Sequence, residues 1–219
     1  VRPIRQHPLT MKTAIALSTL ALLGMAPHGE LKDLNLGDAL PLPDHRMMDV
    51  SGQEKSLKEL AGKNGLLVIF TCNTCPFVVG TDDSEGWEGR YPELGVFARK
   101  HGVGVALVNS NEAKRAMGDS FDDMKKRYTE KGYNHYYLLD KDHQVADAFA
   151  ARTTPHVFLF DKDLKLVYKG AVDDRVEKAA DVKQPFVRNA ITNLAEGKPI
   201  DPAVTRNIGC SIKRVEHTH

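Results

Sequence analysis

The chain has 219 residues, 42% of them hydrophobic, and its 30 basic and 29 acidic side chains give a formal net charge of +1. This length fits one domain of ordinary size with additional segments, and such a domain buries most of its apolar surface without disulfides. Because the charge is balanced and no basic block stands out, a nucleic-acid partner is not expected. Three cysteines are too few for a structural disulfide framework.

The N-terminal segment has the pattern of an export signal. Lys12 precedes an apolar run from Ala14 to Ala26, and Gly24 and Ala26 are small residues at the spacing that a signal peptidase recognises. The run is shorter than the ~20 apolar residues that span a bilayer. We therefore expect export to a periplasmic or extracellular compartment and no membrane span after cleavage. A buried N-terminal helix is the alternative.

The expected organisation has four parts. Residues 1–26 form the signal peptide, and residues 1–10 are a candidate extension upstream of a native start at Met11. A linker follows at 27–36, then the folded domain at 37–198, and last a C-terminal tail at 199–219.

The first half of the domain alternates strands and helices. Apolar periodicity and turn residues predict a hairpin at 47–50 and 53–56, a helical turn at 57–61, a strand at 66–71, an interrupted helix from Pro76, a helix at 91–101 and a strand at 103–108. The run at 66–71 is almost continuously apolar, which is typical of a central strand buried on both faces.

The second half continues the pattern and ends with an antiparallel pair. We expect a polar loop at 109–119, a helix at 120–131 capped by Ser120, a strand at 136–139, a helix at 144–150, strands at 156–160 and 164–169 joined by a turn at 161–163, and a helix at 185–196. Strands and helices in this order predict an α/β sheet with helices on both faces.

Cys72 and Cys75 form a Cys-x-x-Cys motif between the apolar strand and Pro76. A strand, two cysteines at this spacing and a helix start are the arrangement of a redox dithiol. Proline favours the first position of a helix, and a helix N-terminus carries partial positive charge that stabilises a thiolate. The thiolate is the form that attacks disulfides, so the motif predicts a catalytic pair.

Several segments together resemble the redoxin branch of the thioredoxin superfamily, which holds thioredoxin-like thiol–disulfide oxidoreductases and peroxiredoxin (AhpC/TSA) relatives. They are Leu36-Gly37-Asp38, the hairpin around Ser51-Gly52, the strand that enters the cysteine motif, and Thr153-Thr154-Pro155 before the strand at 156–160. The resemblance runs from about Gly37 to Lys198. It implies an α/β, thioredoxin-like fold: a central mixed β-sheet with helices on both faces and a C-terminal antiparallel hairpin.

The resemblance also implies an activity. Cys72 and Cys75 would cycle between dithiol and disulfide through mixed disulfides with protein thiols. An unidentified electron donor would supply the electrons. The matching proline of the superfamily is cis, so we expect a cis bond at Pro155 and expect Thr154 to offer its backbone to an extended substrate. An ordinary proline at a strand entry is the alternative. No cofactor is implied.

Departures from the pattern keep a second enzyme class open. Thioredoxin-like sites usually carry tryptophan before the first cysteine, where this chain has Thr71, and its one tryptophan is Trp87. Aligned on Cys75-Pro76, the peroxiredoxin threonine is replaced by Cys72. A peroxiredoxin-like thiol peroxidase with antioxidant activity is therefore the alternative rather than the first expectation.

The sequence favours Cys75 over Cys72 as the attacking thiolate. Proline at the first helical position makes Cys75 the N-cap, whose sulfur would lie nearest to the free backbone N–H groups. The usual reading of the motif, in which the first cysteine attacks, stays open.

Cys210 and His156 are the remaining candidate residues for the redox site. Cys210 is interpreted first as a buried thiol that packs the tail, and second as a third redox thiol docking near Cys75. His156 follows Pro155 and is a candidate for tuning the pKa of the thiols.

A copper-binding or copper-delivery module is the alternative from another class. Its third ligand would come from His135, His143 or His156, although lone histidines are more often surface or hydrogen-bonded residues. We expect no metal, because zinc would want a second cysteine pair. Asp173 and Asp174 are expected to begin a solvated loop, and the charged residues at 122–127 to form a solvated helix face.

Overall fold

A seven-stranded mixed sheet forms the centre of the described part of the chain, residues 1 and 31–215. In this computed structural model the strand order is β2-β1-β5-β4-β3-β7-β8. The strands are β1 (Arg46–Asp49), β2 (Glu54–Ser56), β3 (Gly65–Thr71), β4 (Val103–Asn109), β5 (Tyr136–Leu139), β7 (His156–Asp161) and β8 (Leu166–Gly170). The predicted mixed α/β sheet is confirmed.

Strand β3 is an interior strand of the sheet, between β4 and β7. It runs parallel to β4 and antiparallel to β7, while β7 and β8 form the predicted C-terminal antiparallel hairpin. Every residue of β3 is buried, as its apolar run predicts. The registers Thr71↔Asn109 and Phe70↔His156 place the end of β3 beside the end of β4 and the start of β7.

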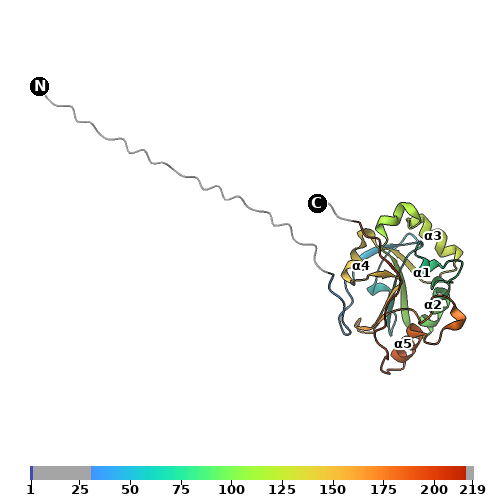
Figure 1. Cartoon of the computed structure of the whole chain (residues 1–219). Helices are drawn as coiled ribbons and strands as arrows, with labels where there is room; N and C mark the ends of the chain where they lie inside the picture. The colour runs from blue at the N-terminus through green and yellow to red at the C-terminus, as the bar shows by residue number, and fades with distance from the viewer. Residues whose placement is uncertain (2–30, 216–219) are drawn as a thin grey trace. The chain divides into compact units, whose positions relative to one another are not determined.

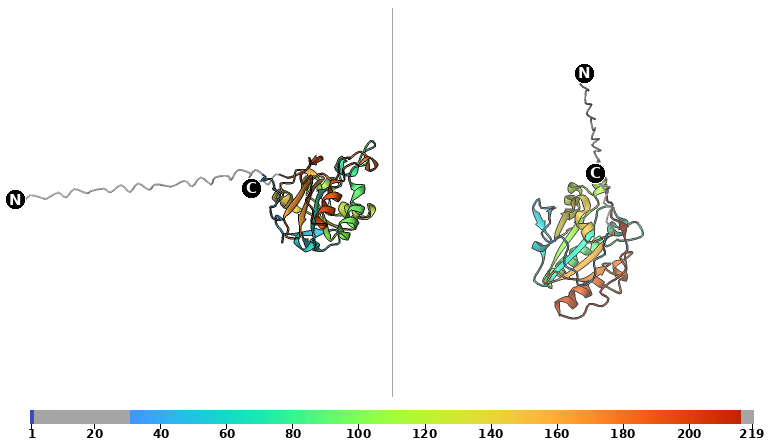
Figure 2. Two further views of the ribbon diagram at one scale, coloured as in Figure 1. Left: turned by 90° about the horizontal axis from the view of Figure 1, so that it is seen from below. Right: turned by 90° about the vertical axis from the view of Figure 1, so that its left-hand side faces the viewer.

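Helices cover both faces of the sheet. They are α1 (Pro76–Val79), α2 (Tyr91–Lys100), α3 (Phe121–Glu130), α4 (Gln144–Ala148) and α5 (Phe186–Ala195), with short 3-10 turns η1 (Lys58–Leu60), η2 (Glu88–Arg90), η3 (Glu112–Met117), η4 (Lys141–His143) and η5 (Ala179–Asp181). Apolar residues of α1, α2, α3 and α5 pack in one core cluster, and those of α4 in the other. Figure 1 and the left view of Figure 2 show α4 on the opposite side of the sheet from α2 and α5.

Helix α3 starts as its sequence predicts. Ser120 is the N-cap, its hydroxyl accepts from the Asp123 backbone N–H, and the Asp123 carboxylate accepts from the Ser120 backbone N–H. This reciprocal capping box satisfies two backbone donors that a helix start leaves open. The capping box therefore fixes the boundary between the segment at 109–119 and α3.

The C-terminal segment belongs to the same compact unit as the sheet. It runs back from α5 toward α4 (Figure 1), and within it β9 (Cys210–Ser211) pairs antiparallel with β6 (Thr153–Thr154). The sequence did not predict this second, two-stranded sheet. The expected signal peptide at 1–26 and most of the linker lie outside the described residues, and no helix among the described residues is long and apolar enough to cross a membrane.

Three expectations about polar segments are wrong in part. The segment at 109–119 is not an open loop, because Asn109, Asn111 and Asp119 are buried and η3 occupies its middle. Asp173 is 5% exposed rather than solvated. On the expected solvated face of α3, Arg127 instead forms an ion pair with the buried carboxylate of Glu88, with Nη2 and Oε2 2.7 Å apart.

Candidate active site

Cys72 and Cys75 lie between the end of β3 and the start of α1, as the motif predicts. Their exposed fractions are 1% and 3%, so both sulfurs are almost fully covered. Cys75 is the N-cap of α1 with Pro76 at the first helical position. This local geometry confirms the sequence argument that proline starts the helix directly after the second cysteine.

Asp119 holds the two residues between the cysteines, and the sequence analysis did not identify it. Its Oδ1 accepts from the backbone N–H of Asn73 at 2.7 Å, and its Oδ2 accepts from the Thr74 hydroxyl at 2.7 Å. The amides of Asn109 and Asn111 donate to the same carboxylate at 2.8 and 3.2 Å. A fully buried carboxylate with four donors is a rigid anchor, so Asp119 fixes the Cys-x-x-Cys loop.

One sequence signal could have pointed to this anchor. Asn109, Ser110 and Asn111 directly follow a buried parallel strand, at the edge where β3 delivers the cysteines. Polar side chains at the carboxyl ends of neighbouring parallel strands come together in space. The sequence nevertheless predicts a loop at 109–119, because no single residue in this segment indicates that it has a buried hydrogen-bond partner.

Thr154 contacts both thiols. Its hydroxyl lies 3.3 Å from Cys72 Sγ, and the Cys75 thiol donates to its carbonyl oxygen at 3.0 Å. The Thr154–Pro155 peptide bond is cis, as the resemblance implies. The structure therefore brings the predicted docking residues, Thr154 and Pro155, to the predicted catalytic pair.

The two thiols have opposite pKa shifts. The pKa of Cys75 is lowered to about 5, chiefly because the Cys72 thiol donates a hydrogen bond to its sulfur; burial opposes the shift, and Cys210 and the Thr154 hydroxyl add to it. The pKa of Cys72 is raised, because its proton is engaged with Cys75, because it is buried, and because the Asp119 carboxylate is near. The negative charge of the pair thus settles on Cys75.

The direction for Cys75 agrees with the sequence argument, but the cause differs. Helix α1 has only four residues, and the Cys75 side chain accepts no capping hydrogen bond from it. Neighbouring thiols and backbone donors, rather than the field of a long helix, lower this pKa.

Cys210 completes a cluster of three sulfurs. The register Thr154↔Cys210 places it on the strand that pairs with the docking residue, and both its thiol and its backbone N–H donate to Cys75. Burial, and then the hydrogen bond to Cys75, raise the pKa of Cys210 to about 11. The interpretation of Cys210 as a thiol that only packs the tail omits this contact.

The histidines lie elsewhere. His156 accepts a hydrogen bond from the Arg152 backbone N–H and its ring lies 4.4 Å from that of Phe158, on the core cluster opposite the thiols. His135 stacks on Tyr133, and His143 pairs with Asp147 at 2.7 Å. Within the described residues, no group of three His, Cys, Asp or Glu side chains is arranged to hold a metal ion.

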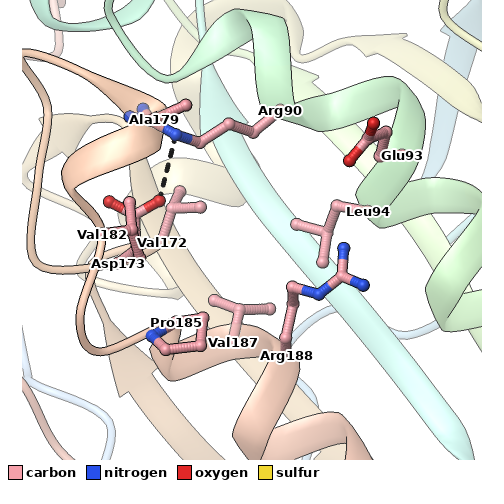
Figure 3. Close-up of a pocket in the computed structure, with 10 residues that line it drawn as sticks. All are labelled: Arg90, Glu93, Leu94, Val172, Asp173, Ala179, Val182, Pro185, Val187 and Arg188. Carbon is pink, nitrogen blue, oxygen red and sulfur yellow. Dashed lines mark ion pairs between the residues drawn. The ribbon is translucent and has the colours of Figure 1, made fainter.

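Asp173 is a buried carboxylate in the segment that follows β8. It accepts from the indole N–H of Trp87 at 2.7 Å and forms an ion pair with Arg90 at 3.2 Å, and burial raises its pKa. Figure 3 shows this pair at the rim of a cavity of about 180 Å³ between α2 and α5. None of the residues that line that cavity is a cysteine.

Comparisons with known proteins agree with this geometry. A family model described as Redoxin matches residues 36–184. The thiol-disulfide oxidoreductase ResA of Geobacillus thermodenitrificans is 27% identical over 169 residues, which are 74% of this chain and 86% of that protein.

Two solved structures have a similar fold. An uncharacterized conserved protein from Geobacillus kaustophilus matches with a TM-score of 0.75 and 33% identity, over 84% of this chain and 94% of that one. A thioredoxin-like protein in its oxidized form matches with a TM-score of 0.56 and 17% identity, over 75% and 99% of the two chains. The fold is thioredoxin-like, as expected.

Proposed function

The chain belongs to the redoxin family, and on that basis we propose that it is a thiol–disulfide oxidoreductase of protein substrates. Cys75 is the attacking thiolate and Cys72 the resolving thiol. The observation that carries this assignment is the place of Cys75, which is the N-cap of α1 and whose sulfur lies at the Thr154 carbonyl on the docking edge. The lowered pKa of Cys75 and the raised pKa of Cys72 agree with it. ResA, which is similar over most of this chain, is named for the same class of reaction.

The reaction is written as two exchange steps. The Cys75 thiolate attacks one sulfur of a substrate disulfide, a new S–S bond forms, and the other substrate sulfur leaves as a thiolate that takes up a proton. Cys72 then gives up its proton and attacks the sulfur of Cys75. The mixed disulfide breaks, the second substrate thiol is released, and the Cys72–Cys75 disulfide remains.

Thr154 supports both steps from one position. Its contacts with the two sulfurs keep them beside the backbone edge that an extended substrate segment would join as an added strand. The hydrogen bond to Cys75, burial and, third, the nearby Asp119 carboxylate raise the pKa of Cys72 and keep it protonated while Cys75 carries the charge.

The compartment is part of the same proposal. The signal-like pattern at 1–26 supports a location outside the cytoplasm, where an oxidising environment keeps a dithiol oxidised unless an electron source reduces it. An external dithiol donor must therefore complete each cycle of disulfide reduction.

Turnover of an insulin or small aromatic disulfide tests the assignment. With dithiothreitol as donor, the wild type is expected to reduce the disulfide, and Cys75→Ser is expected to lose the activity. Lys126→Ser, on the exposed face of α3, is the control for expression and handling. Thermal unfolding of each variant separates loss of chemistry from loss of fold.

Three results would contradict the proposal. Activity that survives in Cys75→Ser but not in Cys72→Ser would make Cys72 the attacking thiol. Rapid consumption of hydrogen peroxide through a sulfenic acid, without disulfide turnover, would favour the peroxidase. Cu(I) retained stoichiometrically against a chelator, again without disulfide turnover, would favour metal handling.

A further inference from the structure

The C-terminal strand occupies the edge that a protein substrate needs. Strand β9 pairs antiparallel with β6, so Cys210 lies opposite Thr154, where the proposed function seats an extended substrate. With this pairing in place, Cys72 and Cys75 are only 1% and 3% exposed. In this arrangement the tail takes the place of a substrate, and its cysteine takes the place of the substrate sulfur.

The approach of the tail depends on Gly209. A Cβ atom at this position would lie 2.4 Å from the Thr154 carbonyl oxygen and 3.2 Å from the Pro155 nitrogen. Contacts as short as the first do not occur between real side chains and a backbone, so only glycine lets the tail lie this close. Gly209 thus allows the tail to pack directly against the backbone of Thr154 and Pro155, which is the proposed docking edge.

Contacts on both sides hold the segment 205–214, here called the strap, in place. Before Cys210, the Thr205 backbone N–H donates to Lys169 at 3.0 Å and the Asn207 amide donates to the Thr153 hydroxyl at 2.8 Å. After it, Ile212 is 5% exposed, the Lys213 backbone N–H donates to Asn111 at 2.9 Å, and Arg214 pairs with Asp147 at 2.6 Å. Cys210 is therefore positioned by a built structure.

The surroundings of the Cys210 sulfur suit exchange with Cys75. The two thiols share a hydrogen bond, and the Phe77 backbone N–H donates to the Cys210 sulfur. A backbone donor of this kind stabilises a developing thiolate. Among the described residues, Cys72 and Cys210 are the two sulfurs that contact Cys75.

We propose, on the basis of the function proposed above, that Cys210 is a third redox thiol that forms a disulfide with Cys75. A small external disulfide such as oxidised glutathione first reacts with the Cys75 thiolate, giving a mixed disulfide and one free small thiol. The Cys210 thiol then gives up its proton and attacks Cys75, the Cys75–Cys210 bond forms, and the second small thiol leaves with a proton.

The same bond connects to the Cys72–Cys75 disulfide without any net oxidation. Cys210 attacks Cys75 as a thiolate, the bond between Cys72 and Cys75 breaks, and Cys72 takes up the proton that Cys210 lost. Since Cys75 can hold only one partner, the two internal disulfides exclude each other.

Disulfide mapping of the full chain with Cys72→Ser tests the proposal. The reduced variant is treated with oxidised glutathione at neutral pH, alkylated and digested without reduction. Mass spectrometry is expected to find the Cys75–Cys210 peptide pair, whereas Cys72→Ser/Cys210→Ser is expected to keep glutathione on Cys75. In the folded single variant, a Cys75 that stays glutathionylated beside a free Cys210 overturns the proposal.

Gly209→Val in the Cys72→Ser background tests the geometry. It keeps both thiols but pushes the strap from Thr154, and a displacement of this size is expected to slow closure of the Cys75–Cys210 bond about 100-fold. If the Cys75–Cys210 bond forms at an unchanged rate in a folded Gly209→Val variant, the strap does not position Cys210 as proposed. Should that variant not fold, the oxidised wild type decides: it is expected to be a mixture of molecules with the Cys72–Cys75 bond and molecules with the Cys75–Cys210 bond, and a sample with Cys72–Cys75 alone contradicts the proposal.

These measurements separate this inference from the proposed function. If Cys75 takes up glutathione and the wild type forms Cys72–Cys75, but no bond to Cys210 appears, only the role of Cys210 is wrong. If Cys75 reacts in none of the variants, the proposed function fails as well.

Discussion

At the scale of single residues, the site depends on which sulfur carries the charge. Cys75 and Cys72 are chemically identical side chains, three positions apart, whose surroundings shift their pKa values in opposite directions. The hydrogen bond from the Cys72 thiol is the main cause of the lowered pKa at Cys75. The assignment therefore predicts a measurable pH profile.

Alkylation of Cys75 is expected to reach half of its plateau rate near pH 5. The thiolate is the reactive form, so the rate rises as the pH passes the pKa and stays level above it. In Cys72→Ala the midpoint is expected to move upward, because the strongest donor is lost. Peptide-level mass spectrometry with iodoacetamide measures both; a wild-type rate that rises only above pH 8 would contradict the assignment.

Asp119 is the second residue on which the site depends. Asp119→Ala removes the acceptor of the buried Asn109 and Asn111 amides, and a buried group left unpaired costs about 1–3 kcal/mol. We expect a lower free energy of unfolding in urea and slower disulfide reduction. Asp122→Ala removes an exposed carboxylate three positions on and is the matched control, for which no comparable loss is expected.

At the scale of elements, the strap is the part that the sequence did not reveal. It makes its contacts with residues far away in the chain, such as Thr153, Asn111 and Asp147. A strand of two residues is too short for its apolar periodicity to be recognised in the sequence. By contrast, β3 and α3 carry their own signals, a continuous apolar run and a capping box, and the structure confirms both.

Ile212→Ala is expected to loosen the strap. Truncating a buried isoleucine costs about 2–5 kcal/mol, and here that loss falls on the docking of the strap. Cys75 should then react faster with a bulky maleimide at neutral pH. The matched control is Ile208→Ala, which truncates an isoleucine of the same strap that is 43% exposed. Equal maleimide rates in the two variants would mean that the strap does not cover Cys75.

At the scale of the whole molecule, the sequence predicted the framework better than its polar interior. Alternating apolar runs indicated the mixed sheet, and the order of motifs indicated the thioredoxin-like fold. The buried positions of Asp119 and Asp173 could not be predicted, because a charged residue shows its partners only after folding. Trp87, which donates to Asp173, lies 86 positions before it.

The whole molecule also reconciles covered thiols with a reaction on protein disulfides. The sheet and α1 hold Cys72 and Cys75 in place, while the strap closes the remaining approach. In the proposed reaction, a protein substrate would first displace the strap from Thr154 in order to pair there. Attack by Cys75 and resolution by Cys72 would follow.

Trapping of the mixed disulfide tests the central claim most directly. Two double variants, Cys72→Ser/Cys210→Ser and Cys75→Ser/Cys210→Ser, are reduced, mixed with a protein disulfide substrate and analysed by mass spectrometry without reductant; Cys210 is removed because it would displace a substrate held on Cys75. The account predicts that Cys72→Ser/Cys210→Ser holds the substrate on Cys75 and that Cys75→Ser/Cys210→Ser traps none. Substrate held on Cys72 in Cys75→Ser/Cys210→Ser, and none trapped by Cys72→Ser/Cys210→Ser, would contradict it.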